Sequence, residues 1–322
     1  MATSTAAIRP GTAIAPKRRF GGDEVAYLIT LIFATSILLV TVLMVWQLWI
    51  HSSPAREKFG FSFLTSKLWN PVTDQFGAWP FMYGTVVTSL LALIIAVPLG
   101  VGAAIYLSEL APAKLSNSLT FLVELLAAVP SVIYGLLAIF TLVPLVRDYI
   151  APAIQAVLGW TPLFSGNVIG YSYFTAGLVL ATMTFPFIIS VSREALMAVP
   201  REQREAALAL GATQWESTFN AVLPFAKLGI FGSIFLALAR ALGETMAVTM
   251  VIGNDPTIHA SLFAPGYTIA SAIANEFTEA TGDTFLSALV ELGLVLFGLT
   301  IVINGVAQLL IVLTTKKGSA KA

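Results

Sequence analysis

Six long apolar stretches constrain the fold of this chain more than any other feature of its sequence. A bilayer core about 30 Å thick requires about 20 consecutive apolar residues to span it as a helix. Stretches of this kind lie at residues 25–50, 84–107, 119–146, 173–192, 229–252 and 285–313. Because backbone groups cannot be hydrogen-bonded by lipid, we expect an all-α polytopic membrane protein with six transmembrane helices.

The composition agrees with a membrane protein and excludes several kinds of site. Charged residues make up only 11% of the chain, against about 25% in a soluble domain. The absence of cysteine excludes disulfides, thiolate metal sites and a cysteine nucleophile. His51 and His259 stand alone, so we expect no metal site. The run 25–50 is longer than the roughly 7–15-residue core of a signal peptide, so we expect it to be retained as the first membrane helix.

The distribution of Lys and Arg predicts which loops face the cytoplasm. Twelve of these residues lie on the side of the two termini, and four lie on the other side. The positive-inside rule therefore places both termini in the cytoplasm. The segments expected to be cytoplasmic are the tails 1–24 and 314–322, the link 108–118 and the loop 193–228. Those expected outside are 51–83, 147–172 and 253–284, and the transmembrane core is expected over 84–313.

The spans also contain prolines, at Pro98, Pro130, Pro144 and Pro186. Each proline removes an amide donor and favours a helix break. Broken helices persist in a membrane only where protein or a water-filled cavity satisfies the freed carbonyl groups.

The loop 193–228 predicts two short helices joined at a glycine. Pro200 suits a first helical turn, and Gly211 ends the first helix. Thr213 and Glu216 have the spacing of a capping box, which starts a second helix that reaches Pro224. Spacing alone leaves two interpretations open: a solvated helical hairpin, or a docking element for a cytoplasmic partner.

This loop resembles the EAA loop of importer-type ABC permeases. The matching residues are Glu205, Ala206, Ala207, Gly211, Leu223 and Pro224. Ala221 stands where the family usually has isoleucine, which removes one apolar anchor. In that family the loop enters a cleft on the ATPase subunit and transmits closure of the ATP site. The resemblance therefore implies that the six matching residues form the ATPase-coupling segment, with Glu205 and Gly211 as coupling residues.

Four further stretches resemble the PstC family of phosphate-specific permeases. They are "ELLAAVPSVIYG" (124–135), "ALARALGETMAVTMVIGN" (237–254), "LFAPGYTIASAIANEF" (262–277) and "ALVELGLVLFGLTIVIN" (288–304). The resemblance covers roughly residues 80–313. It implies the type I ABC importer permease fold and phosphate import across a bacterial inner membrane, without a cofactor.

The resemblance also implies partner proteins. They are a homologous PstA-like permease, a cytoplasmic PstB-like ATPase dimer and an extracytoplasmic PstS-like phosphate-binding protein. The chain has no G-x-x-x-x-G-K-[ST] loop, so we expect it not to be an enzyme and ATP hydrolysis to belong to a separate polypeptide. The loop 253–284 carries acids but no Lys or Arg, and is either a docking surface for the binding protein or a solvated loop.

Two charges lie near the middle of the span 229–252. Arg240 is the twelfth of its 24 residues and Glu244 is the sixteenth. Two central charges cost roughly 5–7 kcal/mol on an insertion scale, and the ten Leu, Ile, Val and Phe residues of the span return roughly 3–6 kcal/mol. Because a lone helix would insert only marginally, we expect both charges to face protein or water.

At four-residue spacing Arg240 and Glu244 share one helix face. They form either a structural ion pair or the polar lining of an anion path, and these roles are compatible. We favour the path, because a guanidinium can fork to two oxygens of phosphate. Glu124 and Glu291, two further intramembrane acids, either join this network or make separate polar contacts.

Three alternative functions stay open. The chain could be the PstA-type partner permease, a permease for another oxyanion such as sulfate or molybdate, or a regulatory membrane subunit with a vestigial pore. The first two belong to the same transport class, and substrate competition separates them from phosphate import. Transport in reconstituted vesicles separates the third.

Overall fold

The computed structural model describes residues 22–319, and no β-strand occurs in that range. Residues 1–21 of the predicted tail 1–24 and residues 320–322 of the predicted tail 314–322 lie outside it, whereas residues 314–319 are helical. Six helical stretches are long and apolar enough to cross a membrane: Asp23–His51, Trp79–Leu110, Ser131–Leu158, Tyr173–Met197, Gln214–Gly243 and Asp283–Leu309. The predicted all-α polytopic fold with six membrane spans is thereby confirmed, whereas the sidedness of the termini stays a prediction.

The chain divides into two compact units, residues 1–47 and 48–322. The first unit contains most of helix α1 (Gly22–His51). The second begins with α2 (Ser53–Phe59), α3 (Ser62–Thr65), α4 (Trp79–Ile105), the π-helical turn η1 (Tyr106–Leu110) and α5 (Ala113–Ala127). It continues with α6 (Ser131–Leu137), η2 (Ala138–Leu142), α7 (Val143–Leu145), η3 (Val146–Ile150), α8 (Ala151–Leu158) and α9 (Tyr173–Met197). It ends with α10 (Arg201–Ala209), α11 (Gln214–Ser217), η4 (Thr218–Val222), α12 (Leu223–Gly243), α13 (Met246–Thr249), α14 (Ile269–Glu276) and α15 (Asp283–Ser319).

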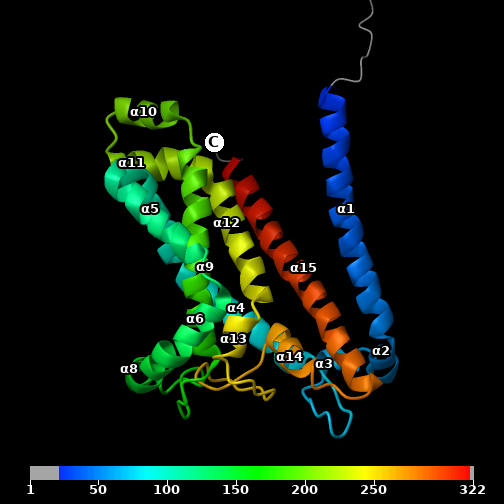
Figure 1. The fold of residues 1–322 in the computed structure, drawn as a ribbon. Coiled ribbons are helices and arrows are strands. Elements are labelled where there is room, and N and C mark those ends of the chain that lie inside the picture. Colours follow the sequence, from blue (N-terminus) through cyan, green and yellow to red (C-terminus); the bar gives the residue numbers. More distant parts are fainter. Residues whose placement is uncertain (1–21, 320–322) are drawn as a thin grey trace, which may run out of the picture. The chain divides into compact units, whose positions relative to one another are not determined.

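The connections of the second unit gather at its two ends (Figure 1). Helices α10 and α11 lie at the end where α15 finishes, whereas α2, α3, α8 and α14 lie at the opposite end. The segment predicted to be cytoplasmic and the segments predicted to lie outside are thus on opposite ends of this unit.

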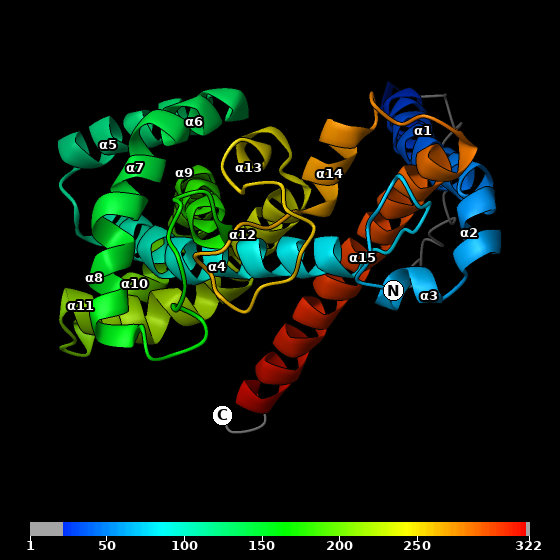
Figure 2. The same ribbon diagram turned by 90° about the horizontal axis from the view of Figure 1, so that it is seen from below.

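Helix α9 is the centre of the second unit. Figure 2 shows it nearly end-on, and it contacts α4, α5, α6, α12 and α13. Its most apolar window is 67% buried, against 33% for the Gln214–Gly243 stretch, so protein rather than lipid surrounds it. Two glycines permit the close approach of α4. A Cβ at Gly100 would lie 2.7 Å from Ile188 Cγ2, and one at Gly177 would lie 2.5 Å from Leu91 Cδ2.

The third span differs from the predicted helix at 119–146. Helix α5 ends at Ala127, Pro130 takes an extended conformation, and a new helix runs from Ser131 to Leu158. Pro130 ends the first helix because it lacks an amide donor and disfavours helical backbone in the residue before it. Part of the predicted outer loop 147–172 is therefore helical, as η3 and α8.

The fifth span also differs from the predicted helix at 229–252. One continuous helical stretch runs from Gln214 through Pro224 and ends at Gly243. The π-helical turn η4 comes directly before Pro224, just as η2 precedes Pro144 and η3 precedes Pro152. We attribute the continuity at these three prolines to the widened turn, which relieves the clash of a proline ring with the preceding turn. The helix breaks predicted at Pro98 and Pro186 are wrong, because α4 and α9 continue through them without such a turn. The other spans differ from their predicted bounds by at most five residues.

Candidate functional site

Helix α10 is the exposed part of the predicted coupling loop. It starts after Pro200 and ends in a Schellman motif, in which the Gly211 amide donates to Leu208 O at 2.9 Å and the Ala212 amide donates to Ala207 O at 3.2 Å. Gly211 has a φ of +89°, a conformation that glycine adopts at no steric cost. The predicted glycine joint is confirmed.

The second helix of the loop starts with the predicted capping box. The Glu216 amide donates to Thr213 Oγ1 at 3.3 Å, and the Thr213 amide donates to Glu216 Oε2 at 2.8 Å. Contrary to prediction, this helix does not stop at Pro224 but continues into the fifth span. The loop and the span are therefore one mechanical element with a proline at the junction.

The residues predicted to couple to an ATPase fall into two groups. Glu205, Ala206 and Gly211 are exposed, and Leu210 beside them is 92% exposed. Leu223 instead packs against a buried cluster shared by α4, α9 and α12. The exposed group also has apolar neighbours, because Trp215 and Phe219 lie on the surface nearby. This end of the molecule therefore presents a mixed apolar and acidic surface.

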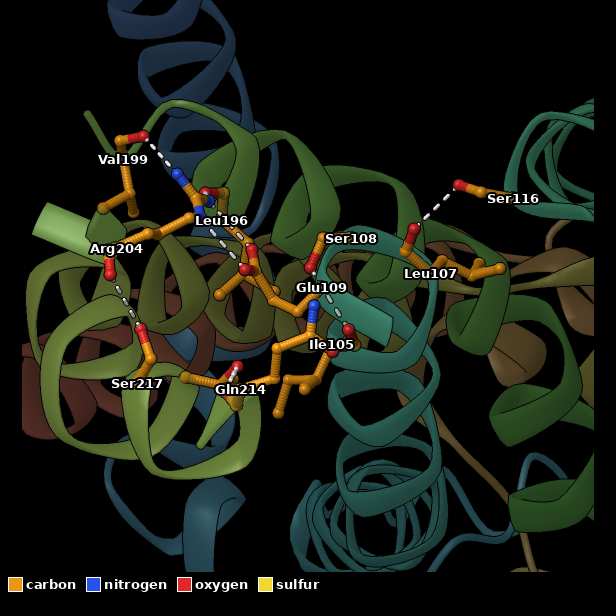
Figure 3. Close-up of polar contacts among 11 residues, drawn as sticks. Ile105, Leu107, Ser108, Glu109, Ser116, Leu196, Val199, Arg204, Gln214 and Ser217 are labelled. Atoms are coloured by element: carbon orange, nitrogen blue, oxygen red, sulfur yellow. Dashed lines mark hydrogen bonds and ion pairs between the residues drawn. The ribbon is translucent and has the colours of Figure 1, made fainter. Parts of the chain in front are cut away.

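Arg204 joins three elements beneath this surface, as Figure 3 shows. Its Nε donates to Glu109 Oε2 at 2.9 Å, and its Nη2 donates to Glu109 Oε1 at 2.8 Å. It also donates to Leu196 O at 2.7 Å and to Val199 O at 2.6 Å, which are carbonyl groups at the end of α9 and just beyond it. One guanidinium thus ties α10 to η1 and to the end of α9.

The Arg204–Glu109 pair is partly shielded from water. The exposed fraction of the side chain is 23% for Arg204 and 8% for Glu109. Hydrogen bonding to the Glu109 carboxylate raises the pKa of Arg204 above its ordinary value, so the guanidinium stays charged. A cavity of about 360 Å³ lies beside it, lined by Ser108, Met197, Val199, Arg201, Arg204 and Glu205. This pair was not predicted from the sequence. Its one signal is that Glu109 ends an apolar stretch that contains no basic residue to neutralise it, so a basic partner must come from elsewhere in the chain.

Close packing then connects α12 with α9. The hydroxyl groups of Ser192 and Ser233 are fully buried and lie 2.8 Å apart. A Cβ at Gly229 would lie 2.4 Å from Ala195 Cβ, so the two backbones approach closely. The backbones of α12 and α9 are therefore closely packed along this stretch.

The prediction that Arg240 and Glu244 share one helix face is wrong. Arg240 lies exposed in the last turn of α12, and the backbone of Glu244 is extended just after the helix ends. Glu244 Oε1 instead accepts a long hydrogen bond of 3.4 Å from the Ala247 amide at the start of α13. Within residues 22–319, no ion pair joins the two charges.

Arg240 lies beside two helix interruptions. Its guanidinium interacts electrostatically with Tyr134, whose hydroxyl donates to Leu126 O at 2.8 Å across the break between α5 and α6. Helix α6 packs against α13 here, since a Cβ at Gly135 would lie 3.0 Å from Ala247 Cα. The two interrupted spans therefore meet near the only basic residue of the described fifth-span segment 229–252.

The two other predicted intramembrane acids are not joined to Arg240. Glu124 is exposed on α5, whereas Glu291 is 6% exposed on α15 and lies near Arg56. In the described part of the chain, no hydrogen bond or ion pair connects any two of Arg240, Glu244, Glu124 and Glu291. A role for these residues in a translocation path stays a prediction.

Comparison with known proteins places these features in a family. Residues 96–313 match the model of the binding-protein-dependent transport system inner membrane component family. The chain is 48% identical over 266 residues to the phosphate transport system permease protein PstC of Mesorhizobium japonicum, covering 81% of each chain. It is 47% identical over 296 residues to PstC of Pasteurella multocida, covering 91% of this chain and 92% of the relative.

The fold also matches a solved structure. A chain of a bacterial ABC transporter involved in the import of the acidic polysaccharide alginate superposes with a TM-score of 0.57 at 16% identity, covering 88% of this chain and 96% of that one. These relatives confirm the resemblance carried by the EAA loop and by the four quoted stretches. This chain belongs to the family of binding-protein-dependent transport system inner membrane components.

Proposed function

We propose that this chain is a permease subunit of an ATP-driven phosphate importer in a bacterial inner membrane. The observation that carries the proposal is the identity of 45–48% to permeases of phosphate transport systems over more than four fifths of the chain. Such a subunit forms the membrane path, and a separate PstB-like ATPase dimer hydrolyses ATP.

In this proposal the ATPase binds the surface formed by Glu205, Ala206 and Gly211. The exposed Leu210 and Trp215 support it, because apolar side chains beside an acidic one suit a cleft on a partner rather than water. Leu223 packs against the buried cluster of α4, α9 and α12 and would then hold this surface in place. Ala207 is partly buried on α10 and Pro224 is exposed, so both can lie at the edge of the same surface. The Arg204–Glu109 pair would pass its movement to η1 and α9.

The other proposed partners are a PstA-like permease and a PstS-like phosphate-binding protein. Two acidic groups of the loop 253–284 are exposed, at Glu279 and Asp283, and suit docking of the binding protein. Glu276 is less suited, because its carboxylate accepts a hydrogen bond of 2.7 Å from Trp69 Nε1. Burial raises the pKa of Glu276, which fits a structural role.

Substrate identity is tested by uptake into vesicles that contain the complete transporter. We expect ATP-dependent uptake of radiolabelled phosphate that a tenfold excess of sulfate or molybdate does not reduce. If sulfate or molybdate inhibits uptake as strongly as unlabelled phosphate does, the transporter accepts oxyanions in general rather than phosphate alone. ATP turnover without any uptake would favour the regulatory role.

The coupling surface is tested by reversing one charge on α10. We expect Glu205→Lys to lower ATPase binding and substrate-stimulated ATP turnover by about tenfold, since a charge-assisted contact is worth about 1.5–3 kcal/mol. Glu202→Lys is the matched control, because Glu202 is equally exposed one turn earlier on the same helix. Equal losses in both variants would show a general effect of charge and contradict the role of Glu205.

A further inference from the structure

An apolar pocket lies at the end of the second unit where α15 begins. It has a volume of about 610 Å³ and lies between α15, α4 and the segment that ends α1 and continues into α3. Its lining is almost wholly apolar, with Leu294, Val295, Gly298, Leu299 and Val302 along α15. The two charged residues that line it are Arg56 and Glu291.

Glu291 is an unsatisfied polar group in this pocket. Its side chain is buried, with 6% exposure, and its Oε2 has no hydrogen-bond partner in the described part of the chain. A buried carboxyl group without a partner is costly, so such a group points to a bound donor. Arg56 interacts with Glu291 electrostatically, yet no ion pair joins the two within residues 22–319.

Arg56 is held in place by its own neighbours. Its guanidinium stacks 3.6 Å from the centroid of the Trp49 ring. Its Nε donates to Ser52 Oγ at 3.1 Å, and its Nη2 donates to Trp49 O at 2.6 Å. Nη1 makes no hydrogen bond within the described residues and can donate to an anionic partner. An arginine and a tryptophan side by side at the end of a membrane span are typical of the headgroup level of a bilayer.

The apolar part of the pocket is comparable in length to one leaflet of a bilayer. From Leu294 to Val302 the helix rises about 12 Å at 1.5 Å per residue. The hydrocarbon core of one leaflet is about 15 Å thick. An acyl chain that lies along α15 can therefore fill the apolar part of the pocket, whose charged groups are at one end.

We propose that this pocket binds one glycerophospholipid with a primary-ammonium headgroup, such as phosphatidylethanolamine. The lipid phosphate binds Arg56, the ammonium group donates to Glu291, and an acyl chain fills the apolar part along α15. A zwitterionic headgroup is the ligand that satisfies an unpaired cation and an unpaired carboxylate together. Glu291 is thereby a lipid ligand rather than a member of the Arg240 path.

The test is native mass spectrometry of the purified full-length chain with equal amounts of phosphatidylethanolamine and phosphatidylglycerol. We expect one retained phosphatidylethanolamine per chain, at several-fold excess over phosphatidylglycerol. Glu291→Gln should abolish that preference, because the charge-assisted hydrogen bond from the ammonium group to the carboxylate is lost. Arg56→Gln should reduce retention of both lipids. The control Glu57→Gln changes an exposed acid on α2 outside the pocket and should change neither.

A second pair of variants tests the acyl-chain site without removing a charge. Gly298 lines the pocket and has open space where a Cβ would stand, so Gly298→Leu fills the pocket without a clash. Gly305→Leu is the control, because Gly305 has the same open surroundings two turns further along α15, outside the pocket lining. We expect only Gly298→Leu to displace the lipid.

Three outcomes would overturn the proposal. They are equal retention of both lipids by the unchanged chain, retention that is indifferent to Glu291→Gln and Gly298→Leu, and loss of the lipid when the chain is measured in the assembled transporter. The last result would mean that a partner subunit covers the pocket. Because the readout is lipid retention, none of these results bears on phosphate transport.

Discussion

Arg240 carries a charge at the surface of a membrane-spanning segment, and its surroundings in this chain offset only part of the free-energy cost of that position. A central charge costs about 2.5–3.5 kcal/mol on insertion scales. Its place in the last turn of α12 returns about 0.3–1 kcal/mol through the helix dipole. We infer that a second subunit or a water-filled path supplies the remainder.

Arg240→Ala should therefore abolish phosphate uptake while the transporter still assembles. We expect the uptake rate to fall more than tenfold, because a permanently charged group for the anion is lost. Arg240→Lys keeps the positive charge but lacks the guanidinium group that can bind two phosphate oxygens at once, so it should retain part of the uptake rate. Uptake of labelled phosphate, with size-exclusion chromatography as the check on assembly, measures both. An unchanged rate in the alanine variant would rule out the path role.

Glu109 and Arg204 should show strong energetic coupling. A double-mutant cycle with Glu109→Gln and Arg204→Gln should give a coupling free energy of about 1–3 kcal/mol in thermal unfolding, because both groups are partly shielded from water. The control is the pair Arg147–Asp148, which forms a hydrogen-bonded contact of 2.7 Å but is about half exposed. We expect no measurable coupling there. Additive effects at Glu109 and Arg204 would show that they act independently.

At the scale of elements, the end of α10 depends on one left-handed residue. Gly211→Ala keeps open space around the new Cβ but strains the backbone at a φ of +89°. We expect a loss of about 1–2 kcal/mol in the free energy of unfolding and weaker stimulation of the ATPase. Gly166→Ala, at a φ of +101° with equally open surroundings, should cost similar stability but leave stimulation unchanged. Equal effects on stimulation would make the role of Gly211 merely structural.

The elements that the sequence predicted well carry their signals locally. Thr213, Glu216 and Gly211 act on neighbours within three or four residues, so the pattern alone identifies the capping box and the joint. Pro130 and Pro224 look alike in sequence, yet one ends a helix and the other does not. Helices α4 and α9 also continue through Pro98 and Pro186, and they do so without a π-helical turn. A proline alone therefore does not determine whether a helix ends.

Contacts between residues that lie far apart in the chain could not be predicted from the sequence, because they depend on how the helices pack. Glu109 and Arg204 are 95 residues apart, and only the packing of α4 against α9 brings them together. For Arg240 and Glu244 the sequence predicts a relation that the structure does not contain. Their four-residue spacing predicts a shared helix face, but the helix ends at Gly243, between the two residues.

At the scale of the molecule, contact between α9 and α12 should determine whether the loop moves with the membrane core. Gly229→Leu places a side chain where even a Cβ would lie 2.4 Å from Ala195 Cβ. We expect a loss of about 1–3 kcal/mol in unfolding stability and lower transport per ATP hydrolysed. Gly232→Leu adds the same side chain to the same helix where there is open space, and should be nearly neutral. Similar losses in both would mean that added bulk on α12, rather than separation from α9, is responsible.

The bend at η4 and Pro224 has a mechanical consequence. Residues 214–222 lie across the end of the second unit, and α12 runs from there into the unit (Figure 1). The stretch therefore forms two arms that meet at an angle near Pro224. Its arms are about 13 Å and about 31 Å long at 1.5 Å per residue. If the angle between the arms stays fixed, a displacement at the free end of the short arm produces a displacement more than twice as large at Gly243.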